Sequence, residues 1–127
     1  MGFILFIIYN ITVPFLIVLS LPVSLLLPTK SFTAKLWIKR VFSDITEFKE
    51  KTIIFHCSSV GEINSVKTLI EYFKKNEPNK KIIITTFTET ANKFAKNITE
   101  YSYILPFDFY PLIKIFIKKA NPDVVFV

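Results

Sequence analysis

Apolar residues follow two different spacings in the part of the chain after residue 50. Short continuous apolar stretches alternate there with longer stretches in which apolar residues recur every three or four positions. Continuous stretches are typical of strands buried on both faces, whereas the wider spacing is typical of amphipathic helices. The pattern therefore predicts strands at residues 51–57, 80–87, 101–105 and 123–127, and helices at residues 60–76, 89–97 and 109–120.

This alternation of strands and helices predicts an α/β fold with a Rossmann-like parallel sheet. Right-handed crossovers place the carboxyl ends of all parallel strands at one edge of such a sheet, where ligands bind. Polar residues collect at this predicted edge: Ser58, Ser59 and Glu62 at the end of the first strand, Thr85, Thr86 and Thr88 at the end of the second, and Pro106 and Asp108 at the end of the third. The pattern predicts a binding site there without defining its chemistry.

The first 29 residues contain no charged side chain. About 20 apolar residues are enough to cross the hydrocarbon core of a bilayer. We expect a membrane anchor at residues 1–29, because the basic start and the cleavage site of a signal peptide are not evident. Pro14 and Pro22 leave two forms open: a kinked spanning helix, which we favour, and a helical hairpin inserted shallowly into the membrane. The alternative is a helix buried in a soluble core.

Residues 30–50 are predicted to form an amphipathic helix at 31–40 and then a connector. Phe32, Leu36 and Trp37 recur at helical spacing, and tryptophan is frequent at membrane interfaces. Cations follow the apolar segment closely, at Lys30, Lys35, Lys39 and Arg40. The positive-inside rule therefore predicts that the rest of the chain lies on the cytoplasmic side of the plasma membrane, where these cations can contact anionic headgroups.

Composition narrows the range of ligands. The net charge of +6 is scattered along the chain, which disfavours nucleic-acid binding and favours anionic lipid or a phosphorylated substrate. Cys57 is the single cysteine, so we expect a free, buried thiol in a reducing compartment. His56 and Cys57 are too few to form a metal site alone. Glycine occurs only at Gly2 and Gly61, which excludes the glycine-rich phosphate-binding loops.

Glu62 has two interpretations. Ser59 and Glu62 have the spacing of a capping box, in which the serine caps a helix and the glutamate reaches back to it. Thr88 and Asp108 occupy the corresponding cap positions of the next two predicted helices. His56 is expected to be a strand-end histidine bonded to a neighbouring backbone group. A carboxylate at the open edge of the sheet can also act chemically, although the spacing alone favours the cap.

Three short motifs resemble those of one enzyme family, the 3-deoxy-D-manno-octulosonic acid (Kdo) transferases. "HCSSVGE" at residues 56–62 resembles the family's H-x-x-SVGE motif. "TTFTET" at residues 85–90 resembles its TT-x-T-x-T segment, and "LPFD" at residues 105–108 resembles its LP-[YF]-D segment. An uncharged N-terminal helix followed by a basic helix, here with Trp37 and Arg40, is also similar to the family. The motifs occur in the family's order, each at the end of a predicted strand.

The resemblance implies the N-terminal, acceptor-side part of a membrane-associated GT-B glycosyltransferase. Such an enzyme transfers Kdo from CMP-Kdo to a lipid A precursor in lipopolysaccharide biosynthesis at the inner membrane. It implies that Glu62 is the general base and that no catalytic metal or tightly bound cofactor is needed. It also implies that the acceptor is bound by residues around these motifs: Ser58, Ser59, Gly61, Thr86, Thr88 and Asp108.

The chain differs from the family pattern at Ala91, where the family has glycine, and at Val41 and Phe42, where it has Phe-Gly after the arginine. The family's E-T-E motif would follow residue 127, so we expect residues 51–127 to be a domain truncated at its fourth strand and inactive alone. Two alternatives stay open. One is another membrane-associated GT-B glycosyltransferase, and the other is a non-catalytic membrane-anchored binding module in which Glu62 only caps a helix.

Overall fold

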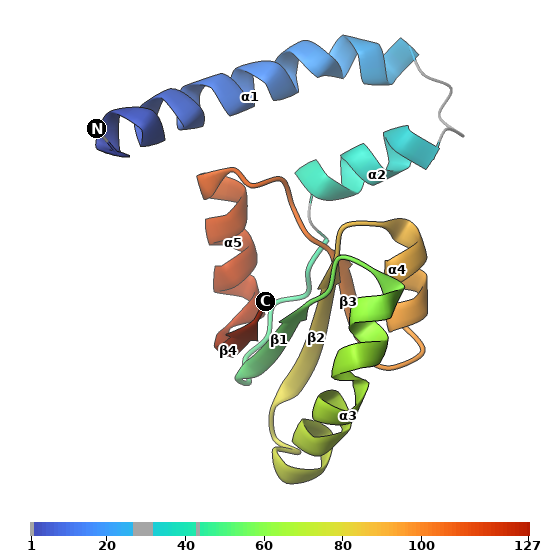
Figure 1. Cartoon of the computed structure of the whole chain (residues 1–127). Helices are drawn as coiled ribbons and strands as arrows, with labels where there is room; N and C mark the ends of the chain where they lie inside the picture. Colours follow the sequence, from blue (N-terminus) through green and yellow to red (C-terminus); the bar gives the residue numbers. More distant parts are fainter. Residues whose placement is uncertain (1, 27–31, 43) are drawn as a thin grey trace.

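The computed structural model describes residues 2–26, 32–42 and 44–127 (Figure 1). These residues form the helices α1 (Gly2–Leu26), α2 (Phe32–Val41), α3 (Val60–Asn76), α4 (Glu89–Ala95) and α5 (Tyr110–Ala120). The strands are β1 (Thr52–His56), β2 (Lys81–Thr86), β3 (Tyr101–Ile104) and β4 (Pro122–Phe126). The predicted α/β fold is confirmed, and α3 has the predicted bounds. Lys30 and Ser31, which the sequence assigns to the basic amphipathic segment, lie outside the described residues.

All pairings in the sheet are parallel, in the order β3-β2-β1-β4. The chain adds strands in one direction from β1 to β3 and then returns to place β4 on the other side of β1. In parallel sheets of this kind the crevice beside such a reversal is the usual place for a ligand. Here the reversal lies between β1 and β4, at the end of β1 that leads to Ser58 and Glu62.

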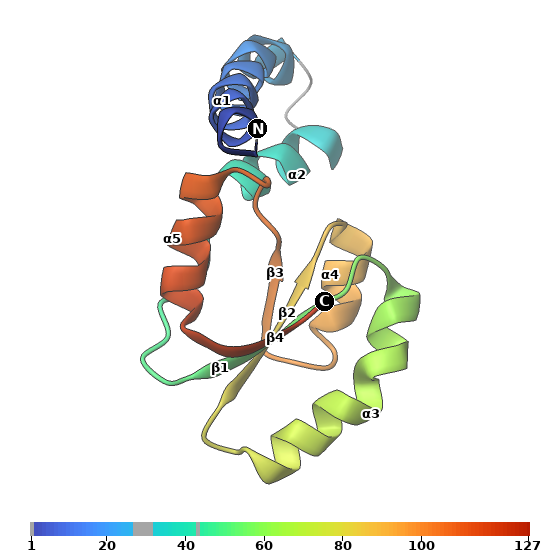
Figure 2. The same ribbon diagram turned by 60° about the vertical axis from the view of Figure 1, so that its left-hand side comes forward.

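Helices cover both faces of the sheet, as Figure 2 shows, with α5 on one side and α3 and α4 on the other. Alternate residues of β1 point to opposite faces, since Ile53 and Phe55 pack with α3 and α4, whereas Ile54 packs with Phe116 of α5. Ile45 and Phe48 of the connector before β1 are buried in this second core. The continuous apolar strands of the sequence are explained by this burial on two faces.

The turn between α5 and β4 ties the connector to the sheet. Asn121 has a left-handed backbone conformation (φ 50°) and donates its N–H to the Ile117 carbonyl at 3.0 Å, which is a usual way to end a helix. Its side-chain amide donates to the carbonyls of Lys49 and Glu50, both at 3.2 Å. Its own carbonyl accepts from the N–H of Thr52 at 3.1 Å. These bonds fix the entry of the chain into β1.

Helix α1 continues through Pro14 and Pro22 as one helix. The stretch Gly2–Ser20 has 19 residues and a mean hydropathy of 2.4, so it is long and apolar enough to cross a membrane. None of these residues is buried in the domain. In Figure 1 the helix runs beside α2, above the start of α5. The Tyr9 hydroxyl donates to the Asp108 carbonyl, and the Phe6 ring meets Tyr110 edge to face at 6.0 Å between centroids.

Candidate site at the carboxyl edge of the sheet

The carboxyl ends of β1, β2 and β3 lie at the edge of the sheet that faces α1 and α2 (Figure 1). We call this the carboxyl edge and define it by the segments that follow the three strands: residues 57–62, 87–89 and 105–109. Because strand pairing fixes where each segment begins, the topology brings together residues that are far apart in the sequence. The sequence-predicted site residues Ser58, Ser59, Gly61, Glu62, Thr88 and Asp108 all belong to these segments, and Thr86 is the last residue of β2.

Glu62 is exposed and forms part of the cap of α3. Ser59 has an extended backbone, and its Oγ accepts from the Glu62 N–H at 3.3 Å, as the capping interpretation predicts. Glu62 Oε2 accepts from the Ser58 N–H at 2.6 Å, one residue before the serine that caps the helix. The carboxylate is therefore held over the first turn of α3 by one oxygen. Within the described part of the chain, no hydrogen bond involves its second oxygen.

Gly61 lies in the first turn of α3, and the fold does not require glycine there. A Cβ at this position would meet only Ser59 Oγ, at 3.7 Å, which is an ordinary contact. The space beside the Gly61 backbone is thus open to a ligand that approaches the start of the helix. Backbone N–H groups at a helix start attract negative charge.

His56 and Cys57 lie directly before this turn. His56 Nδ1 is 3.0 Å from Thr85 Oγ1, and a hydrogen bond with the Thr85 backbone is of the kind that we expected. Its ring packs edge to face on Phe87 at 4.7 Å between centroids. Burial lowers the pKa of His56, and the nearby Glu62 charge acts in the opposite direction. Cys57 is a buried free thiol, as predicted, and burial raises its pKa.

The threonines at the end of β2 and directly after it serve mostly to shape the turn. Thr86 is fully buried, and its hydroxyl donates to the Thr88 carbonyl at 3.3 Å. Thr88 is exposed and caps α4, as predicted, with its Oγ1 accepting from the Ala91 N–H at 3.2 Å. Ala91 itself is buried in the core beside α3. A ligand at this edge therefore meets Thr88 before it meets Thr86.

The prediction that Asp108 caps the third helix is wrong. The cap residue of α5 is Phe109, which makes no side-chain capping bond, and α5 begins at Tyr110. Pro111 favours a helix start at this place, because its missing N–H costs nothing in a first turn. Asp108 lies in the preceding turn, in which the Phe109 N–H donates to the Phe107 carbonyl at 2.6 Å. Its side chain is exposed, and its carbonyl accepts from Tyr9 of α1.

Arg40 of α2, which the sequence analysis did not include among the site residues, contacts the carboxyl edge. Its guanidinium carbon is 4.3 Å from the centroid of the Phe107 ring and 5.4 Å from that of Phe87. Its Nε donates to the Leu105 carbonyl at 3.3 Å. Trp37 packs edge to face on the same Phe107 ring at 5.6 Å between centroids. The sequence signals for Arg40 were its position one helical turn after Trp37 and the similarity of this basic helix to the family.

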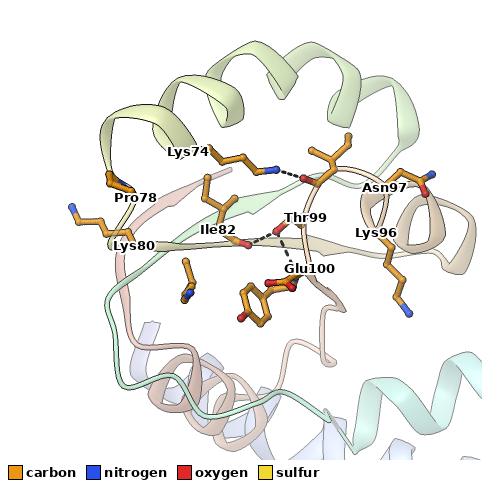
Figure 3. A pocket seen from close by; sticks show the side chains of 11 residues that line it. Lys74, Pro78, Lys80, Ile82, Lys96, Asn97, Thr99 and Glu100 are labelled. Atoms are coloured by element: carbon orange, nitrogen blue, oxygen red, sulfur yellow. Dashed lines mark hydrogen bonds between the residues drawn. The ribbon is translucent and has the colours of Figure 1, made fainter.

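A hollow of about 450 Å³ lies at the opposite edge of the sheet (Figure 3). Several lysines line it, but they do not converge on one point. The Lys74 ammonium donates to the Ile98 carbonyl, Lys80 pairs with Asp123 at 2.7 Å, and Lys96 points away from Lys80. In the part of the chain that the structure describes, no three His, Cys, Asp or Glu side chains lie close enough to hold a metal ion. The lysines of this hollow therefore do not form a convergent site.

The fold and this edge define an α/β domain of the kind that binds its ligand beyond the ends of parallel strands. The sequence model of the family described as 3-deoxy-D-manno-octulosonic-acid transferase (kdotransferase) matches residues 33–127. The chain belongs to this family, as the three motifs predicted.

Two curated relatives support this membership at modest similarity. The chain is 29% identical over 75 residues to the 3-deoxy-D-manno-octulosonic acid transferase of Chlamydia trachomatis serovar D, and equally to that of serovar A. The aligned part covers 56% of this chain and 17% of each relative. The chain thus spans only a small part of the relatives that it matches. No solved structure matches it significantly.

The environment of His56 predicts a pH dependence of folding. Burial lowers the pKa of His56 below its ordinary value of 6.5, so below that pH the unfolded chain takes up a proton that the folded chain does not. The free energy of unfolding should therefore fall as the pH drops below the ordinary value. His56→Gln removes this linkage. Urea unfolding of both proteins in detergent, from about pH 7.5 to about pH 5.5, should show the wild type losing more stability. Two parallel pH curves would contradict the assignment.

Proposed function

We propose that this chain supplies the acceptor side of a Kdo transferase that moves Kdo from CMP-Kdo to a lipid A precursor. The observation that carries the proposal is the exposed Glu62 carboxylate, which the SVGE motif and the cap of α3 hold at the carboxyl edge. The chain's membership of the family supplies the reaction class. In this proposal the enzyme has the GT-B arrangement, and the donor binds residues outside this chain.

The reaction that we propose needs one base and one defined acceptor hydroxyl. Glu62 takes the proton of that hydroxyl, and the oxygen attacks the anomeric carbon of Kdo. The bond from this carbon to the CMP phosphate breaks with inversion, and CMP leaves with the electron pair. A general base must come within about 2.6–3.2 Å of the oxygen that it deprotonates. The bond from the Ser58 N–H restrains one oxygen of Glu62, while the other is available to the acceptor.

The acceptor, in this proposal, lies across the three segments of the carboxyl edge. Ser58, Ser59 and Gly61 would contact it at the start of α3, where open space borders Gly61. Thr88 and Asp108 would contact it from the neighbouring segments, since both are exposed. Thr86, which is buried, would act by holding the turn that presents Thr88. The reaction as proposed uses no metal and no bound cofactor.

Glu62→Gln tests the proposed base. The amide oxygen can still accept from the Ser58 N–H, so the variant should fold with nearly unchanged stability. Without a base, Kdo transfer by the intact protein, meaning this chain together with its donor-binding part, should fall roughly 10²–10⁴-fold in kcat. Glu71→Gln, an exposed position on the same helix, makes the same change of charge and should leave the rate unchanged. The measurement is transfer from CMP-Kdo to a lipid A precursor in membranes.

The alternative interpretation predicts a different outcome. If Glu62 only caps α3, Glu62→Gln should transfer Kdo at nearly the wild-type rate, and Ser59→Ala should be the more damaging change. Loss of a serine cap costs about 1 kcal/mol of stability. A non-catalytic binding module would show no transfer in the wild type either.

We further propose that α1 anchors the chain to the cytoplasmic face of the inner membrane by lying along it. A spanning helix was the form favoured by its length. The structure shows one continuous helix, so the helical hairpin is not the form observed. The contacts of Tyr9 and Phe6 with the β3–α5 region favour a single helix that lies along the membrane, because they hold the first turns of α1 against the domain. The apolar surface of α1 would then enter the membrane while the carboxyl edge faces the lipid acceptor.

Accessibility of the N-terminus separates these two forms. Phe3→Cys introduces a thiol at a position that is 75% exposed, whereas the native Cys57 is buried. A membrane-impermeant maleimide applied from the periplasmic side should not label it if α1 lies on the cytoplasmic face. Labelling after the membrane is dissolved in detergent is the positive control, and the wild-type chain gives the background. Labelling from the periplasm in intact spheroplasts would show that α1 crosses the bilayer.

A further inference from the structure

Arg40 is a half-buried cation without a carboxylate partner among the described residues. The neighbouring Lys39, by contrast, pairs with Glu89 at 2.8 Å. Removing a charge from water is costly unless other groups replace the water. For Arg40 the replacement is partial. It consists of the Phe107 and Phe87 rings and one bond from Nε to the Leu105 carbonyl.

Most of the hydrogen-bond donors of Arg40 therefore have no partner among the described residues. A guanidinium has five N–H donors, and only the Nε donor has a hydrogen-bond partner within the described part of the chain. The two terminal nitrogens together form the fork that binds a phosphate through two parallel bonds. The aromatic rings and the Leu105 carbonyl restrain the guanidinium before a ligand binds, which reduces the entropy lost on binding.

The Arg40 guanidinium contacts two segments of the carboxyl edge. Phe87 belongs to the segment after β2, whereas Leu105 and Phe107 belong to the segment after β3. Arg40 comes from α2, next to α1, on the side of the domain that carries the apolar helix (Figure 1). A ligand held there would touch the two segments that carry Thr88 and Asp108.

The side chain of Arg40 is not the sole attachment of α2 to the domain. The backbone already makes that link, since the Phe107 N–H donates to the Arg40 carbonyl at 3.2 Å. Trp37 packs on Phe107 and adds to the same attachment. A neutral or apolar side chain at position 40 would serve a purely structural purpose at lower desolvation cost.

We propose that Arg40 binds a phosphate group of the lipid acceptor through the terminal nitrogens of its guanidinium. This inference rests on the proposed function, because it names the part of the acceptor that the carboxyl edge recognises. The phosphate would fix the position of the acceptor sugar relative to Glu62, while its acyl chains stay in the bilayer beside α1. The scattered net charge of +6 supplies a general attraction to anionic lipid, and Arg40 adds the specific contact.

Binding to vesicles tests this proposal. The chain is bound to phosphatidylcholine vesicles that contain the bisphosphorylated lipid A precursor, the same lipid after phosphatase treatment, or phosphatidylglycerol. Arg40→Gln should weaken binding to the phosphorylated precursor roughly tenfold and leave binding to the dephosphorylated lipid unchanged. Arg40→Lys keeps the charge between the rings but loses the fork, so it should fold like the wild type and still bind the phosphorylated lipid more weakly.

Lys35→Gln is the matched control, since Lys35 is an exposed cation on the same helix. It should weaken binding much less than Arg40→Gln. Equal losses for the two variants would overturn the proposal in favour of general electrostatic attraction. Equal losses by Arg40→Gln on phosphorylated and dephosphorylated lipid would overturn it in favour of a structural role. A loss of the same size on phosphatidylglycerol vesicles would overturn it in favour of bulk headgroups.

The wild type separates failure of this inference from failure of the proposed function. A wild-type chain that binds vesicles equally with and without the lipid A precursor would contradict the acceptor-side function itself. A wild-type chain that prefers the precursor, with the same preference in both Arg40 variants, would overturn the role of Arg40 alone.

Discussion

Strand β1 is hydrogen-bonded along both of its edges, to β2 on one side and to β4 on the other, and this pairing sets the position of the whole carboxyl edge. In the register between β1 and β2, Phe55 lies opposite Ile84 and His56 lies opposite Thr85, so the chain leaves β1 beside the end of β2. Helix α3 must then begin within a few residues, because its apolar face has to pack on the same strands. The short connection therefore places the capping residues Ser59 and Glu62 beside the end of β1.

The cap and the proposed base are compatible uses of one side chain. A carboxylate has two oxygens and about four acceptor positions, and the Ser58 N–H occupies one of them. A capping bond that holds the side chain over the helix start also limits the rotamers that a base would otherwise have to sample. In the proposed reaction, the first turn of α3 would thus both position and orient the base.

The sequence predicted the centre of the sheet well because β1 and β2 are buried on both faces, and continuous apolar runs such as that around Ile83 are hard to accommodate otherwise. It predicted the start of α3 because a serine cap is a local signal. It missed the start of α5, since Asp108 and Pro111 are competing local signals and the proline fits the first turn better.

The environment of Arg40 could not be predicted from local pattern. Its contacts come from Phe87 and Phe107, which follow different strands and meet only after the sheet has formed. The same holds for Tyr9 of α1, whose bond to the Asp108 carbonyl joins residues that are 99 positions apart in the sequence. Hydrophobic periodicity describes which face a residue occupies, but not which residue of a distant segment it meets.

The most direct measurement is a structure of the intact protein with a lipid A precursor bound. We predict that the acceptor hydroxyl lies within about 3.2 Å of the free oxygen of Glu62, with the capping bond to Ser58 retained. An acceptor bound elsewhere, with Glu62 bonded only to its own helix start, would contradict the claim that the carboxyl edge is the catalytic site.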